Sequence, residues 1–88
     1  MISEAQLADI AGWLNAHGAG EGCLPELRQR YPDLHFTWCM DDDVGCESVA
    51  REEAGFSLYL VDGSNHCLAF TTDAGAATGV VIAELAND

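Results

Sequence analysis

The clearest pattern in the chain is an alternation of apolar and polar positions over residues 56–71. From Phe56 to Leu60 every second side chain is large and apolar, and a similar alternation resumes at Leu68. The residues between these runs include Asp62, Gly63, Ser64 and Asn65, which favour turns. Alternation on both sides of a glycine-containing turn is typical of a β-hairpin. We therefore predict that a hairpin over residues 56–71 forms the centre of the fold.

Two amphipathic helices are predicted before this hairpin. Ser3 and Gln6 have the spacing of a capping box at a helix start. An apolar stripe at helical spacing follows them: Leu7, Ile10, Ala11 and Leu14. Pro25 suits the first turn of a second helix, and Pro32 stops that helix.

The remaining segments complete a predicted α+β domain. Apolar and polar residues alternate over residues 34–40, which predicts a strand. Asp73 has the character of an N-cap for a last helix, whose inner side would be Ala77, Val81, Ile82 and Leu85. The predicted order is α-α-β-β-β-α, a three-stranded antiparallel meander with helices packed on one face. We see no repeat or boundary, so residues 1–88 form a single small domain.

The charge of the chain limits its partners. Fifteen acidic residues face three basic ones, giving a formal net charge of −12. Such a surface repels the phosphates of nucleic acids and anionic lipid headgroups, so we expect neither direct nucleic-acid binding nor membrane binding. Acidity that only maintains solubility is one interpretation. A protein partner with a basic surface is the functional alternative.

An acidic segment follows the first predicted strand. Between Asp41 and Gly55 the apolar pattern is lost, and we predict a long loop. Its acidic residues would steer a basic protein: Asp41, Asp42, Asp43, Glu47, Glu52 and Glu53. A calcium-binding loop is disfavoured because Cys46 stands where such loops require glycine.

One aromatic residue joins this predicted docking surface. When helices cover one face of a sheet, the other face is exposed to solvent or bound by a partner. Tyr59 and Val61 fall on that other face. Tyrosine beside charged residues suits protein recognition, whereas the alternative is that Tyr59 completes a small core.

The four cysteines provide a second hypothesis. No export signal precedes them, so we expect reduced thiols in a cytoplasmic protein. A small metal-binding or redox module could use ligands of the types that zinc and iron accept: Cys39, Cys46, His66 and Cys67. Their spacing matches no metal motif, and buried cysteines also serve as small apolar residues. Acidic surroundings raise the pKa of a thiol, which disfavours a cysteine nucleophile. We therefore predict neither a cofactor nor enzymatic activity.

Two runs, HFTWCMDDDVGC and FSLYLVDGSNHCLAFTTDAGAATGVVIAE, resemble a family of small, acidic, uncharacterised bacterial proteins. Some members of that family accompany nitrogen-fixation genes. The resemblance covers residues 31–84 and implies a cytoplasmic accessory role, but it transfers no site residue. Together with the charge, it favours a non-enzymatic, soluble accessory protein that docks on another protein.

Overall fold

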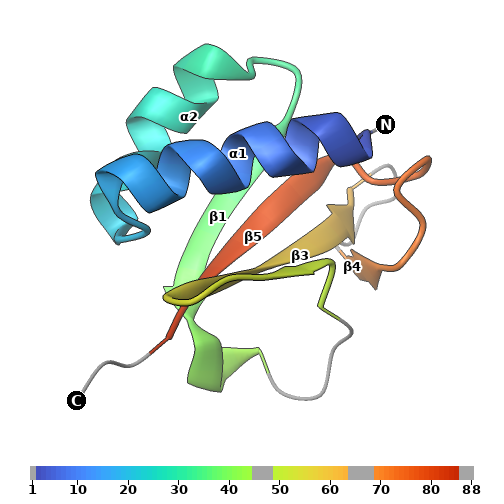
Figure 1. Ribbon diagram of the computed structural model, residues 1–88. Coiled ribbons are helices and arrows are strands. Elements are labelled where there is room, and N and C mark those ends of the chain that lie inside the picture. The colour runs from blue at the N-terminus through green and yellow to red at the C-terminus, as the bar shows by residue number, and fades with distance from the viewer. Residues whose placement is uncertain (1, 45–48, 64–68, 86–88) are drawn as a thin grey trace.

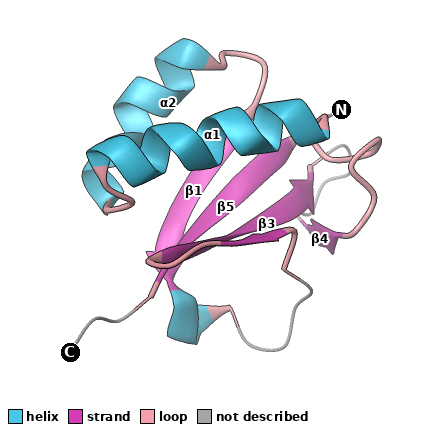
Figure 2. Ribbon diagram, in the orientation of Figure 1, coloured by secondary structure: helices cyan, strands magenta, loops and turns pink. Residues whose placement is uncertain are grey.

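The computed structural model describes residues 2–44, 49–63 and 69–85, and it is a two-layer α+β fold (Figure 1). Two helices lie on one face of a five-stranded mixed sheet (Figure 2). The elements in chain order are α1 (Glu4–His17), α2 (Leu24–Arg30), β1 (His35–Met40), β2 (Arg51–Glu52), β3 (Phe56–Asp62), β4 (Ala69–Thr71) and β5 (Gly79–Glu84). Two 3₁₀ turns complete the description: η1 (Glu21–Cys23) and η2 (Asp41–Asp43).

The start of α1 has the predicted capping box. The Ser3 hydroxyl accepts a hydrogen bond from the Gln6 backbone N–H at 3.1 Å, and the Ser3 N–H donates to the Gln6 side chain at 2.9 Å. These bonds satisfy donors that have no partner within the first helical turn. The helix ends at Gly18, whose φ of 98° lies in a region that glycine adopts without strain.

The predicted hairpin is confirmed where the structure describes it. β3 pairs antiparallel with β4, and Leu60 lies opposite Thr71. The turn residues 64–68 lie outside the described residues. β2 also pairs with β3, so these two short strands share one edge of it.

The predicted three-stranded meander is wrong, because β5 separates β1 from β3. The sheet order is β1-β5-β3-β2, with β4 paired to β3 beside β2. β5 runs parallel to β1 and antiparallel to β3. The sheet is therefore mixed, and its central strand comes from the end of the chain.

The predicted last helix is also wrong, because a strand takes its place. Residues 79–84 form β5, and Val80, Val81, Ile82 and Ala83 are all buried although they are consecutive. A strand buried on both faces produces a continuous apolar run, and β-branched residues favour it. Asp73 accepts a hydrogen bond from the Gly75 N–H at 2.9 Å, which makes a local turn instead of a helix cap.

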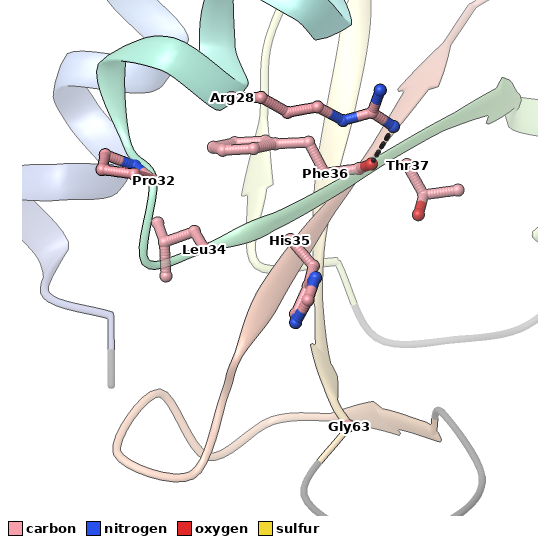
Figure 3. Close-up of a pocket in the computed structure, with 7 residues that line it drawn as sticks. All are labelled: Arg28, Pro32, Leu34, His35, Phe36, Thr37 and Gly63. Atoms are coloured by element: carbon pink, nitrogen blue, oxygen red, sulfur yellow. Dashed lines mark hydrogen bonds between the residues drawn. The ribbon is translucent and has the colours of Figure 1, made fainter.

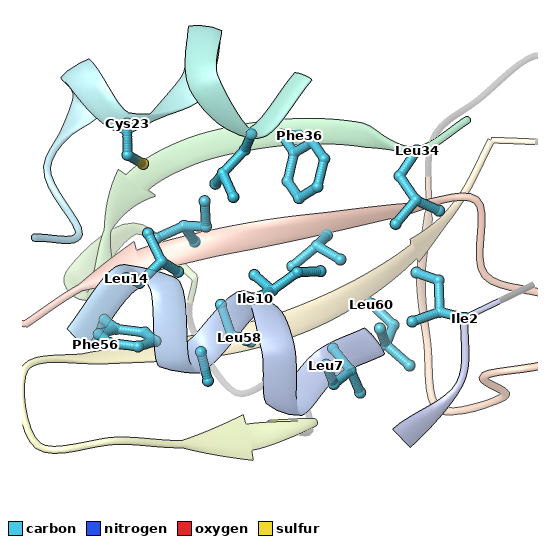
Figure 4. Close-up of a cluster of buried hydrophobic side chains, with 14 of the residues drawn as sticks. Ile2, Leu7, Ile10, Leu14, Cys23, Leu34, Phe36, Phe56, Leu58 and Leu60 are labelled. Carbon is cyan, nitrogen blue, oxygen red and sulfur yellow. The ribbon is translucent and has the colours of Figure 1, made fainter. Parts of the chain in front are cut away.

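Both faces of the sheet are covered. The larger core lies under the helices, where Ile10 and Leu14 of α1 meet Leu58 of the sheet (Figure 4). Ile82 belongs to the same core. The second core lies on the opposite face and consists of Val44, Tyr59, Val61, Val81 and Ala83, with Cys39 packed against it. The expectation that Tyr59 and Val61 are exposed is therefore wrong: they are 7% and 3% exposed.

Candidate functional site

The topology brings acidic residues from three segments to one end of the sheet. β1 and β5 run parallel and finish side by side, so Met40 lies opposite Glu84. β3 starts at this end, with Phe56 also opposite Glu84, and β2 finishes here (Figure 1). The acidic residues at or beside these strand ends are Asp41, Asp42, Glu52, Glu53 and Glu84. We call this set the acidic end.

One member of the acidic end is held by the fold. Glu53 accepts a hydrogen bond from the Asn15 amide of α1 at 3.0 Å and another from the Arg51 guanidinium at 2.9 Å. The bond from Asn15, and then the bond and charge of Arg51, lower the pKa of the Glu53 carboxyl. Glu53 therefore ties the β2–β3 connection to the end of α1.

We expect Asn15→Ala to raise the pKa of Glu53 toward its ordinary value, because the amide donor is the largest cause of the shift. A depressed carboxyl pKa contributes stability that is present above the unfolded pKa and is lost as pH falls through the folded pKa. The variant should therefore lose less stability on acidification than the wild type. Titration of the Glu53 carboxyl by NMR and urea unfolding between neutral and acidic pH measure both effects. Identical titration curves for the two proteins would refute the assigned bond.

Asp41 faces inward toward the second core. Burial raises the pKa of Tyr59, and the charge of Asp41 and a hydrogen bond with it raise this pKa further. Smaller contributions come from Cys39 and from Glu52. Tyr59 therefore acts in the packing of the second core, beside the η2 turn that carries Asp41.

The outward-facing acids of this end are Asp42 and Glu52. Both residues are exposed, whereas Glu84 is half-buried. Asp43 is the last residue of η2, and Glu47 lies outside the described residues. The set of docking residues predicted from the sequence does not include Glu84. That prediction places Glu84 in a last helix and not at the end of the sheet. Recognition of the buried run before it as a strand would have placed it at the sheet end.

The predicted metal ligands can be compared with the structure only at Cys39, because Cys46, His66 and Cys67 lie outside the described residues. Cys39 is half-buried on the second face of the sheet. In the part of the chain that the structure describes, no three histidine, cysteine or acidic side chains are placed to hold a metal ion together. Cys23 is the last residue of η1, directly before α2, and is buried; burial, with a smaller effect of Glu84, raises the pKa of its thiol.

A hollow of about 380 Å³ lies at the other end of β1 (Figure 3). It is lined by residues of α2, of the following turn, of β1 and by the residue after β3: Arg28, Pro32, Leu34, His35, Phe36, Thr37 and Gly63. The Arg28 guanidinium crosses to the strand and donates a hydrogen bond to the Phe36 carbonyl oxygen at 3.2 Å. Arg28 therefore lies against the first half of β1, and aspartates follow the end of this strand.

Comparisons with known proteins agree with an uncharacterised family. Residues 9–85 match the model of a family of unknown function (DUF6129). No curated protein and no solved structure matches the chain. Neither described helix is long and apolar enough to span a lipid bilayer.

Proposed function

We propose that this chain, which belongs to the family of unknown function DUF6129, is a non-enzymatic accessory protein that docks through its acidic end on a protein partner with a basic surface. The observation that carries the proposal is the convergence of acids from η2, β2 and β5 at one sheet end. Among the described residues of that end, the cation Arg51 is already engaged by Glu53. The charges of Asp42 and Glu52 are therefore left for a partner.

The physical role of such an end is steering. Complementary charge accelerates encounter and disfavours partners of the wrong sign, more than it adds raw affinity. Rim charges of this kind are screened by salt, with a Debye length of about 8 Å at physiological ionic strength. The resemblance to small acidic bacterial proteins supports a cytoplasmic accessory role, and proteins that accompany nitrogen-fixation genes are the natural first place to seek the partner.

The test is capture of a partner from an extract of the native host, with the immobilised wild-type chain and two variants of equal charge. Glu52→Gln with Glu84→Gln removes two of the five acidic charges of the acidic end. Glu4→Gln with Asp9→Asn removes the same charge from α1, whose residues at these positions are exposed. We expect the first variant to bind the recovered partner about three- to tenfold more weakly, as two rim charge pairs allow.

The control variant should bind within about twofold of wild type, and added salt should weaken wild type more than the acidic-end variant. Equal losses in the two variants would show that only net charge matters. Binding that salt leaves unchanged would overturn the proposal.

A further inference from the structure

The outer edge of β1 is long, apolar and open. β1 lies at the end of the strand order and pairs with β5 on its other side. Its sequence, HFTWCM, contains no proline, lysine or acidic residue, which are the residues that commonly protect sheet edges. The opposite edge of the sheet is built differently, because β2 and β4 are only two and three residues long and β2 carries Arg51 and Glu52. Such an unprotected edge strand is a template for another strand.

The register identifies which backbone groups are free. The His35 N–H donates to the Thr78 carbonyl oxygen at 3.1 Å, so the backbone of His35 faces β5. Backbone groups of successive residues in a strand point to opposite sides, so those of Phe36, Trp38 and Met40 point outward. The Phe36 carbonyl oxygen is taken by Arg28 at 3.2 Å. The outward N–H and C=O groups of Trp38 and Met40 are therefore the ones left for a partner strand.

The side chains along this edge are self-complementary. Trp38 and Met40 are both only half-buried, so each has apolar surface left for a partner. Arg28 lies at the level of Phe36, near the start of the strand, and Asp42 is exposed just after its finish. In the described part of the chain, Arg51 forms an ion pair with Glu53, whereas Arg28 forms none.

We propose that the edge of β1 pairs antiparallel with β1 of a second copy of this chain, around a two-fold axis at Cys39. Trp38 of each copy then lies opposite Met40 of the other, and their outward N–H and C=O groups bond across the axis. The same operation brings Arg28 of each copy toward Asp42 of the other. An isologous interface of this kind makes every contact twice.

Charge selects this occupant and this direction. Antiparallel pairing places Arg28 of one copy beside Asp42 of the other, whereas parallel pairing would align Arg28 with Arg28 and Asp42 with Asp42. The paired surface is small, so we expect a weak dimer with a dissociation constant in about the micromolar range. The dimer shares Asp42 with the acidic end but leaves Glu52 and Glu84 free, and the docking test changes only those two residues. Dimerisation and docking of a basic partner can therefore fail separately.

Sedimentation equilibrium across a concentration series measures the dimerisation of the wild type and of Met40→Pro, which removes one outward N–H from the edge of β1. The φ of Met40 is −78°, which proline adopts, and its N–H points away from β5, so the monomer should keep its fold. Met40→Ala removes the side chain and keeps the N–H. We expect dimers for wild type, weaker dimers for Met40→Ala and monomers for Met40→Pro with an unchanged circular dichroism spectrum. A wild-type chain that stays monomeric at about millimolar concentration, or a Met40→Pro dimer of wild-type strength, would overturn the proposal.

Charge reversal tests the antiparallel direction. Arg28→Glu and Asp42→Arg should each be monomeric alone, because a dimer of either variant would contain two pairs of like charges. A mixture of the two variants should form heterodimers, because both opposing pairs are then of unlike charge. A mixture that remains monomeric while wild type dimerises would rule out this arrangement of the copies.

Discussion

Replacing Ile82 with alanine is expected to lower the free energy of unfolding by about 2–5 kcal/mol. Ile82 is fully buried at 0% exposure in the central strand, between Trp38 of β1 and Leu58 of β3. Truncation removes apolar contacts and leaves a cavity under the helices that the rigid sheet fills poorly. A domain of this size has a total stability of about 4–13 kcal/mol, so the change is a large fraction of it. Urea unfolding followed by circular dichroism measures the loss.

Val49→Ala is the control for this substitution. Val49 is also a β-branched aliphatic residue, but 40% of it is exposed, so its truncation should change stability by no more than about 0.5 kcal/mol. Val81→Ala should be costly as well, because Val81 is 5% exposed and packs on the opposite face of β5. A loss below about 1 kcal/mol at Ile82 would contradict the central position of this strand.

Gly79→Ala is the second substitution with a large expected effect. A Cβ atom at Gly79 would lie 2.7 Å from the His35 carbonyl oxygen and 3.2 Å from Cγ2 of Val61. Gly79 pairs with His35 on one side and with Val61 on the other, so both neighbouring strands would have to move. Overpacking of this kind costs about 1–3 kcal/mol, which urea unfolding resolves.

Gly12→Ala is the matched control, with an effect of opposite sign. Gly12 lies on the exposed side of α1, and a Cβ there would meet nothing within 4 Å. Alanine inside a helix is more stable than glycine by about 0.5–1 kcal/mol, so the free energy of unfolding should rise. If alanine at both positions had the same effect, the close approach of β1 and β3 to Gly79 would be excluded.

The parts of the fold that sequence could predict are those fixed by neighbours in the chain. The capping box of Ser3 and Gln6 and the pairing of β3 with β4 depend on short-range spacing, and both were predicted correctly. The prediction of a helix in place of β5 is wrong because Ala77, Val81, Ile82 and Leu85 also fit a helical stripe. Only the burial of all four consecutive residues 80–83 distinguishes the strand, and that burial depends on two distant strands.

The candidate site shows the same division between local and distant information. The acidic residues after β1 are evident in the sequence, and Asp42 and Glu52 are exposed as a docking surface requires. The sequence predicts an exposed Tyr59 because it indicates no element that packs on the second face of the sheet. Val44, which follows η2, packs on that face with Tyr59 instead. Glu84 reaches the acidic end only through the parallel pairing of β5 with β1.

That parallel pairing is also what gathers the acids, and NMR contacts between backbone protons of β1 and β5 test it most directly. We expect contacts of Met40 with Glu84 and of His35 with Gly79, together with contacts of Glu84 with Phe56 on β3. Contacts of Met40 with Gly79 would mean that β5 runs in the opposite direction. Glu84 would then lie at the far end of the sheet from Asp42, and the acidic end would not exist.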